Sequence, residues 1–211
     1  MAQIYTWNKE GFENSYWKYF YKLRGCGASR AHNCRCTDTY ITYSRNFFET
    51  NEMFKERATK VVNKLSLPVG SKVLVVGAAL GYIMEEFKKL GMEPYGIDNS
   101  QYIKSIKNKE KVKFDIDDID ITDNNFMNSM NRLVGVTQFD CIVTEDVLPS
   151  HDNWTKIFQN CEAVLKPELN KNRIVHIVEV NASGDFVSKT HEQWAALNTN
   201  HTWLDQNGNA R

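Results

Sequence analysis

The sequence lacks several features that would assign it at once to a class of protein. No run reaches the roughly 18 apolar residues of a membrane-spanning helix. Residues 1–7 have neither the basic nor the apolar region of a secretion signal. The five cysteines are an odd number, which argues against the paired disulfides of a small secreted protein. We therefore expect a cytoplasmic protein with reduced cysteines and no membrane contact.

The sequence also lacks net charge, because 26 Lys and Arg balance 26 Asp and Glu. No overall field therefore draws the chain to nucleic acid or to anionic lipid, although a local basic patch would escape this average. The apolar fraction of 42% is ordinary for a globular protein and provides for a substantial core. A length of 211 residues suits one domain with an appendage.

Three parts of the chain differ in composition. Residues 1–65 are rich in aromatics and show no alternation of strands and helices, so we interpret them as an N-terminal extension that forms a lid, helical around 9–23 and 45–65. Residues 66–185 form the main domain. Residues 186–211 supply a short C-terminal helix and a tail.

Short apolar runs alternate with helical stretches in the main domain, which is typical of a parallel sheet with right-handed crossovers. We expect strands at 73–76, 95–98, 112–114, 139–144 and 173–180. Helices are expected at 81–90, 101–108, 123–134 and 152–166, the last capped by Asp152, and Gly91 should end the first of them. The tail has room for a helix near 190–197, a small strand at 201–204 and a frayed end at 205–211. The fold class is therefore α/β, a doubly wound and mostly parallel sheet of five or six strands with an N-terminal helical extension.

A loop of small residues follows the first expected strand, at Gly77-Ala78-Ala79-Leu80-Gly81. Small residues let the backbone approach a ligand closely, and the next helix offers its N-terminus. Asp98 ends the second strand 21 residues after Gly77, where a carboxylate can accept hydrogen bonds from both ribose hydroxyls. An acidic cluster follows the third strand at 115–118. In such sheets ligands lie beyond the carboxyl ends of the strands, so we expect a nucleotide-type ligand there.

The segments 73–81, 95–100 and 139–148 resemble successive motifs of class I S-adenosylmethionine-dependent methyltransferases. The resemblance covers about 72–180 and implies a Rossmann-like domain with S-adenosylmethionine as its cofactor. It implies that the glycine loop lines the methionine and ribose, that Asp98 holds the ribose, and that Asp118 with the Ile119 backbone faces the adenine. The cofactor-binding residues it implies are Gly77, Ala78, Ala79, Gly81, Asp98, Asn99, Asp118, Ile119 and Glu145.

The loop departs from the family pattern at two positions. Ala79 takes a glycine position, and Val75 stands where an acidic residue is common. These departures motivate an alternative, a non-catalytic cofactor-binding or partner module that kept the fold. A nicotinamide dinucleotide would use the same geometry, but the loop is not Gly-x-Gly-x-x-Gly, because its third residue is Ala79 and its sixth is Tyr82.

The catalytic candidates follow the fourth strand at Glu145, Asp146 and His151. Transfer of a methyl group from a sulfonium mainly requires a positioned acceptor and excluded water, and a base is needed only if the acceptor must lose a proton. His151 is either such a base or a surface residue at a helix start, and the sequence favours the second interpretation. No Asp-Pro-Pro-Tyr-type motif of amino-methylating DNA enzymes is present, so we expect a small-molecule acceptor.

Two features of the extension bear on partners. Residues 16–45 carry six Lys and Arg against one acidic residue, interleaved with aromatics, so nucleic acid or protein is an alternative acceptor for this segment. The cluster Cys26, His32, Cys34 and Cys36 has the residue types of a zinc site but poor spacing. We therefore expect no metal, and we interpret Cys141 and Cys161 as small core residues. The sequence leaves the oligomeric state open.

Overall fold

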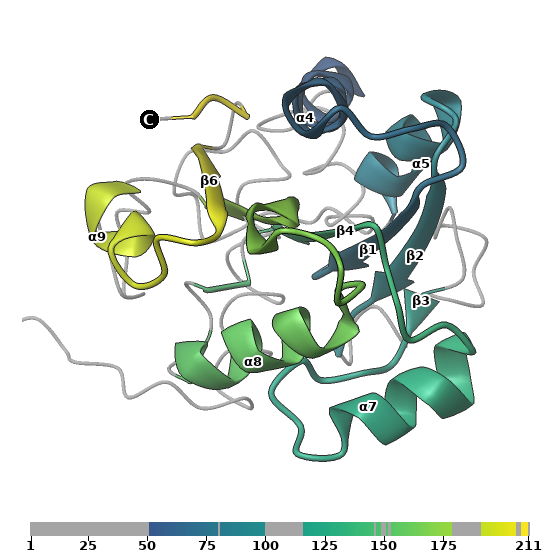
Figure 1. The fold of residues 1–211 in the computed structure, drawn as a ribbon. Helices are drawn as coiled ribbons and strands as arrows, with labels where there is room; N and C mark the ends of the chain where they lie inside the picture. The colour runs from purple at the N-terminus through teal and green to yellow at the C-terminus, as the bar shows by residue number, and fades with distance from the viewer. Residues whose placement is uncertain are drawn as a thin grey trace, which may run out of the picture.

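Six strands form one sheet in the computed structural model of the protein (Figure 1). The structure describes residues 51–79, 81–99, 116–145, 147–148, 151, 153–178, 191–205 and 208–210. The strands are β1 (Lys72–Val76), β2 (Glu93–Ile97), β3 (Ile116–Asp117), β4 (Cys141–Glu145), β5 (Ile174–Val178) and β6 (Thr202–Asp205). Their order is β3-β2-β1-β4-β5-β6, and every pair of neighbours is parallel. The predicted parallel α/β sheet of five or six strands is confirmed.

Helices cover both faces of this sheet. In Figure 1, α4 (Asn51–Leu65) and α5 (Tyr82–Lys89) lie on one face, and α7 (Phe126–Ser129) and α8 (Trp154–Val164) lie on the other. Shorter elements are the π-helix Met130–Val134, the 3-10 turn Lys171–Arg173 and α9 (His191–Ala195). The fold is therefore doubly wound, and the order of its strands reverses between β1 and β4.

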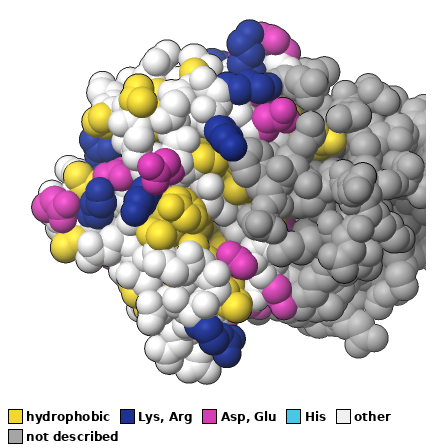
Figure 2. Space-filling view, turned by 90° about the vertical axis from the view of Figure 1, so that its right-hand side faces the viewer, with side chains coloured by type: hydrophobic (Ala, Val, Ile, Leu, Met, Phe, Trp, Pro, Cys, Tyr) yellow, Lys and Arg dark blue, Asp and Glu magenta, His cyan; other side chains and the backbone are white. Residues whose placement is uncertain are grey.

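The outer surface near β2 and β3 mixes charges of both signs. Among the described residues drawn in Figure 2, Lys and Arg side chains lie beside Asp and Glu side chains, around a patch of apolar side chains. This mixture agrees with the balanced composition of the chain. Within the described ranges, no helix is both long and apolar enough to cross a membrane.

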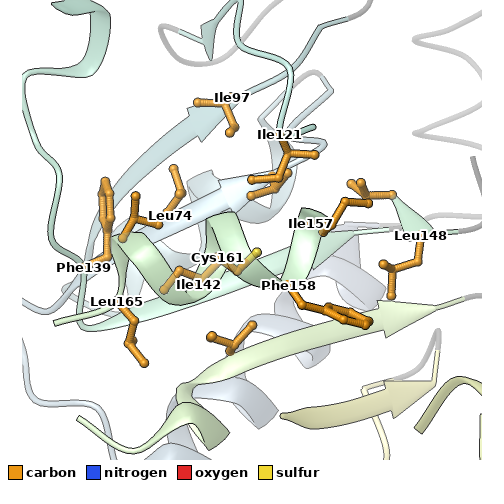
Figure 3. Close-up of a cluster of buried hydrophobic side chains, with 14 of the residues drawn as sticks. Leu74, Ile97, Ile121, Phe139, Ile142, Leu148, Ile157, Phe158, Cys161 and Leu165 are labelled. Carbon is orange, nitrogen blue, oxygen red and sulfur yellow. The ribbon is translucent and has the colours of Figure 1, made fainter. Parts of the chain in front are cut away.

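Alternating strand residues separate the core into two layers. Val73 and Val75 of β1 pack with the helices α4 and α5, whereas Leu74 and Val76 pack on the other face. Figure 3 shows that second layer, in which Ile157 and Cys161 of α8 lie over the sheet. Burial raises the pKa of both Cys141 and Cys161 to about 12, so these thiols are packing residues, as predicted.

The helix α4 shares the core of the sheet. Its Phe54, Ala58, Val61 and Leu65 are buried with β1 and α5. Residues 51–65 of the predicted helix at 45–65 are therefore helical. This helix packs on the sheet and shares its core, although the sequence places it in the extension before residue 66. The predicted helix at 9–23 and the segment 16–45 lie outside the described residues, so the lid stays a prediction.

Several predicted boundaries are confirmed or corrected. Gly91, with φ of 82°, ends α5 as predicted. The expected strand at 112–114 and helix at 101–108 lie outside the described residues. The strand β3 includes Ile116 and Asp117, whereas the sequence predicts a loop there. The cap of α8 is Asn153 rather than Asp152, because the Asn153 side chain accepts a hydrogen bond from the Lys156 amide at 3.2 Å.

The C-terminal tail pairs with the sheet over more residues than the sequence predicts. The strand β6 joins the sheet in parallel beside β5, and Ala210 forms an isolated antiparallel bridge with Leu204. The Asp205 carboxylate accepts a hydrogen bond from the Asn209 amide at 2.9 Å. The prediction of a frayed end is therefore wrong for residues 208–210, because a turn closed by Asp205 returns them to the sheet.

Candidate functional site

The loop after β1 lies beside the end of β4, where the strand order reverses. Val76 of β1 is in register with Thr144 of β4, so Gly77 and Glu145 follow side by side. A Cβ added to Gly77 would lie 2.9 Å from the Glu145 backbone oxygen and 2.6 Å from Cγ2 of Val147. Gly77 also has a φ of 75°, a left-handed conformation that residues with a Cβ rarely adopt. Glycine is therefore required here by both space and conformation.

Hydrogen bonds attach the loop to the end of β2. The amides of Gly77 and Ala78 both donate to the Ile97 carbonyl, at 3.0 and 3.1 Å. The Ala79 amide donates to Oδ2 of Asp98 at 2.9 Å, with Ala79 in the left-handed region at φ 48°. The Asp98 carboxylate thus fixes the conformation of the loop, in addition to its predicted role toward a ribose.

Ala78 and Gly81 of the loop have structural roles. The Ala78 side chain is buried in the core, and its carbonyl accepts a hydrogen bond from the Gly81 amide, a geometry that favours a packing role for Ala78 over ligand contact. Gly81, with φ of 81°, is the N-cap residue of α5 and makes no side-chain cap. The first turn of α5 therefore begins directly at the end of this loop, as the sequence predicts.

After β3, Asp120 contacts Asn99 beyond the end of β2 and lies near His151 beyond the end of β4, and sequence reasoning did not include it. Asp118 is exposed, and Ile119 is buried in the core. Burial alone would raise the pKa of the Asp120 carboxyl, but hydrogen bonds from Thr122 and Asn99, together with the nearby His151, lower it below its ordinary value. The sequence did contain a signal, since Asp followed two residues later by Thr is a turn pattern, and Asp120 accepts hydrogen bonds from both the amide and the hydroxyl of Thr122.

The candidates after β4 are in different environments. Glu145 forms an ion pair with Arg57 of α4, in which Nη1 and Oε1 are 2.6 Å apart. Asp146 lies outside the described residues. His151 is half-buried, and its Nδ1 lies 2.9 Å from the Val147 carbonyl. Since a carbonyl only accepts, Nδ1 carries a proton, and Nε2 of the neutral ring carries the lone pair that a general base needs.

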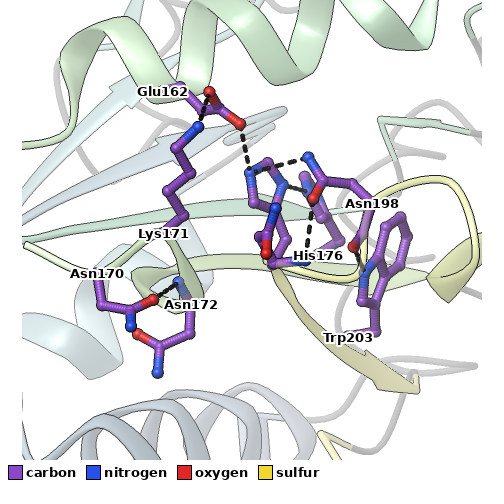
Figure 4. A network of polar contacts seen from close by, with 9 residues as sticks. Glu162, Asn170, Lys171, Asn172, His176, Asn198 and Trp203 are labelled. Atoms are coloured by element: carbon purple, nitrogen blue, oxygen red, sulfur yellow. Dashed lines mark hydrogen bonds and ion pairs between the residues drawn. The ribbon is translucent and has the colours of Figure 1, made fainter.

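A buried chain of hydrogen bonds begins one residue before Glu145 (Figure 4). Thr144 Oγ1 lies 2.8 Å from His176 Nδ1, and His176 Nε2 lies 2.9 Å from His201 Nδ1. His201 Nε2 in turn lies 3.3 Å from a carboxylate oxygen of Glu162, which pairs with Lys171 at 2.6 Å. Asn198 Nδ2 also lies 3.2 Å from His201 Nε2, so the chain connects polar groups of β4, β5, α8 and the turn before β6, each of which has a partner. No sequence pattern indicated this chain.

Metal ligands are not grouped in the part of the chain that the structure describes. Across those ranges, no three His, Cys, Asp or Glu side chains are arranged to hold a metal ion. Cys26, His32, Cys34 and Cys36 lie outside them.

The fold and the carboxyl ends of the strands define a class of protein. It is a doubly wound domain with a loop of small residues and with carboxylates where the strand order reverses. A family model described as a methyltransferase domain matches residues 50–207, which is most of the chain. The chain therefore belongs to this methyltransferase domain family, and the predicted resemblance is confirmed.

Solved structures were also compared with the chain. It is similar to a SAM-dependent methyltransferase from Archaeoglobus fulgidus, at 18% identity over 61% of this chain and 54% of that chain, with a TM-score of 0.46. It is similar to an S-adenosylmethionine-dependent methyltransferase from Clostridium acetobutylicum, at 22% identity over 54% and 46%, with a TM-score of 0.41. The glycopeptide N-methyltransferase MtfA, solved with sinefungin, matches at 15% identity over 53% and 49%, with a TM-score of 0.42. The chain spans about half the length of these structures. No curated protein sequence matches it significantly.

Proposed function

We propose that the protein is a methyltransferase that binds S-adenosylmethionine across the carboxyl ends of β1, β2 and β4 and methylates a small-molecule acceptor. The observation that carries the proposal is the Asp98 carboxylate, which lies at the end of β2 and accepts a hydrogen bond from the Ala79 amide. A ribose needs a carboxylate beside a closely approaching backbone, and this arrangement offers both.

The residues present fit such a cofactor. The space at Gly77 would be filled by any Cβ, and positive φ angles at Gly77, Ala79 and Gly81 turn the backbone sharply before α5. A carboxylate has two oxygens and about four acceptor positions, so Asp98 can retain the Ala79 amide and still accept from hydroxyl groups. Bound S-adenosylmethionine would supply an activated methyl group.

The chain itself would contribute orientation and, where the acceptor requires it, removal of a proton. Among the residues that the structure describes, His151 is a candidate base, because its ring lies beyond the end of β4 and the Val147 carbonyl orients it through Nδ1. Asp120, whose carboxylate lies close to His151, places a negative charge beside this candidate base. Asp146 stays a candidate from the sequence.

The small-molecule acceptor is supported by composition and surface rather than by a recognised motif. Charges of both signs mix on the face drawn in Figure 2, whereas a protein that grips nucleic acid concentrates Lys and Arg. The basic segment 16–45 and the lid stay predictions. Retention of RNA on the protein that weakens with salt, and is lost when Arg30 and Arg35 are neutralised, would instead favour a nucleic-acid acceptor.

Calorimetry with S-adenosylmethionine tests the cofactor assignment. We expect Asp98→Ala to weaken binding by about tenfold to a hundredfold, because it removes hydrogen bonds to a charged group worth roughly 1.5–3 kcal/mol. The matched control is Glu93→Ala, since Glu93 is exposed at the opposite end of the same strand and should bind like the native protein. Failure of the native protein to bind the cofactor would refute the proposal, as would equal affinities of the two variants.

A further inference from the structure

The strand β6 packs on the sheet through two buried histidines. It is the last strand in the order of the sheet, pairs with β5 in parallel, and all four of its residues are buried. His176 of β5 is fully buried, and His201, directly before β6, is 6% exposed. The centres of the two imidazole rings are 5.1 Å apart, and the Trp203 ring of β6 lies 4.5 Å from that of His176. Imidazole rings therefore make up much of the contact between β5 and β6.

The facing nitrogens of the two rings have room for one proton between them. His176 Nε2 and His201 Nδ1 are 2.9 Å apart, which is a hydrogen bond in which one nitrogen donates and the other accepts. If both rings were imidazolium, an N–H group of each would point at the other across this distance. The pair therefore cannot become fully protonated while the two rings stay in place.

The surroundings of the pair also favour neutral rings. His176 Nδ1 meets the Thr144 hydroxyl rather than a carboxylate. In the described part of the chain, the charged groups that face the pair are Glu162, 3.3 Å from His201 Nε2, and Lys171, 2.6 Å from Glu162. Burial lowers the pKa of both histidines, and at His201 it outweighs the opposite effect of Glu162, while Lys171 also opposes a second proton there.

The strand β6 continues into a turn that reaches α4. The Asn209 amide donates to Asp205 Oδ1 at 2.9 Å, and Lys60 Nζ of α4 donates to Oδ1 of Asn209, also at 2.9 Å. A Cβ added to Gly208 would lie 3.2 Å from the Cα of Arg57, so the turn packs closely on the backbone of the helix. In Figure 1 this C-terminal segment lies beside α4. Release of β6 from β5 would therefore also loosen the turn from α4.

We propose that His176 and His201 form a pH-sensitive latch, which holds β6 and the turn after it to the sheet at neutral pH and releases them together in acid. The latch goes beyond the proposed function and does not depend on the ligand that the protein binds. Because the open segment takes up protons that the closed segment excludes, opening becomes easier as the pH falls below about 6.5. The strands β1 and β4 lie in the middle of the sheet and are buried on both faces, so opening of the last strand can stay local.

Hydrogen exchange measured by mass spectrometry separates local from global opening. Peptides that cover β6 report on the latch, and peptides that cover β1 report on global unfolding. After correction for the pH dependence of chemical exchange, the opening constant of β6 should rise between pH 7.5 and 5.5 by about tenfold for each histidine that takes up a proton only when open. It should exceed the opening constant of β1 at both pH values. Equal opening constants for β6 and β1, or a β6 opening constant that does not change with pH, would overturn the latch.

Variants connect the opening to the histidines. His176→Gln takes up no proton at this position and should reduce the rise at β6 about tenfold, whereas the control His151→Gln, which changes a histidine beyond the end of β4, should leave the rise unchanged. Equal reductions in both variants would overturn the latch. If His176→Gln proves unfolded by circular dichroism, Glu162→Gln replaces it, because the Glu162 side chain is 29% exposed and both histidines remain. This variant removes the carboxylate that favours a proton on His201 in the closed state, so the rise should be at least as large as in the native protein, and a smaller rise would overturn the latch.

Discussion

Replacing Gly77 by alanine should destabilise the protein by about 3 kcal/mol, through two separate costs. The first is conformational, because φ is 75° and a left-handed conformation costs a residue with a Cβ roughly 1–2 kcal/mol. The second is steric, because the new Cβ would lie 2.6 Å from Cγ2 of Val147 and 2.9 Å from the Glu145 backbone oxygen. The Val147 side chain can rotate, but the backbone oxygen cannot yield without moving the end of β4, and overpacking of this kind costs about 1–3 kcal/mol.

Gly70 provides a matched control for the conformational cost. It also has a positive φ, of 84°, but nothing lies within 4 Å of the position of its Cβ. The change Gly70→Ala should therefore cost only about 1–2 kcal/mol, and the excess in Gly77→Ala measures the steric contact with β4. Urea unfolding followed by circular dichroism gives both free energies of unfolding.

Ala79→Gly is the reverse change in the same loop. It removes the conformational cost at φ 48° but adds freedom to the unfolded chain, so a stabilisation of about 0.5–1 kcal/mol is expected.

If Gly77→Ala cost no more than Gly70→Ala, the close approach between the loop and β4 would be refuted as the reason for glycine at 77.

Two further predictions concern histidines. His151→Gln should lower the turnover number at least tenfold while calorimetry shows unchanged affinity for S-adenosylmethionine, and a parallel fall in affinity would contradict a base role. Burial lowers the pKa of His176 well below its ordinary 6.5, and burial also lowers that of His201 despite the neighbouring Glu162. Since the unfolded chain binds these protons more readily, the free energy of unfolding should be level above pH 6.5 and fall below it, by up to about 1.4 kcal/mol per pH unit for His176. Urea unfolding between pH 7.5 and 5 tests this, with His176→Gln expected to flatten the curve.

The unit from β1 to β2 could be predicted from the sequence because its determinants are local. The run Val73–Val76 is buried on both faces, Gly77 must turn immediately after it, and Gly91 ends the intervening helix. Each of these signals lies within a few residues of the feature that it specifies. The position of Asp98 at the end of the second strand follows from the same local pattern.

The contacts that complete the site could not be predicted in this way, because they join distant parts of the chain. Arg57 and Glu145 are 88 residues apart, and the sequence gives no reason to pair a helix of the predicted extension with the fourth strand. His176 and His201 are 25 residues apart and meet only because β6 lies beside β5. Asp120 accepts a hydrogen bond from Asn99, which lies 21 residues earlier in the chain, beyond the end of β2.

The two departures from the family pattern have different structural consequences. Val75 is fully buried in the apolar core beside α5, so its side chain contributes packing where a carboxylate would need a partner. Ala79 adopts a left-handed conformation, with φ of 48°, and its amide donates to Asp98. Backbone strain of this kind persists only where the surroundings determine it, and it gathers at ligand sites. The strained alanine is therefore an argument for a loop held ready for a ligand, and the absence of glycine at 79 is a weak argument for a module that has lost its cofactor.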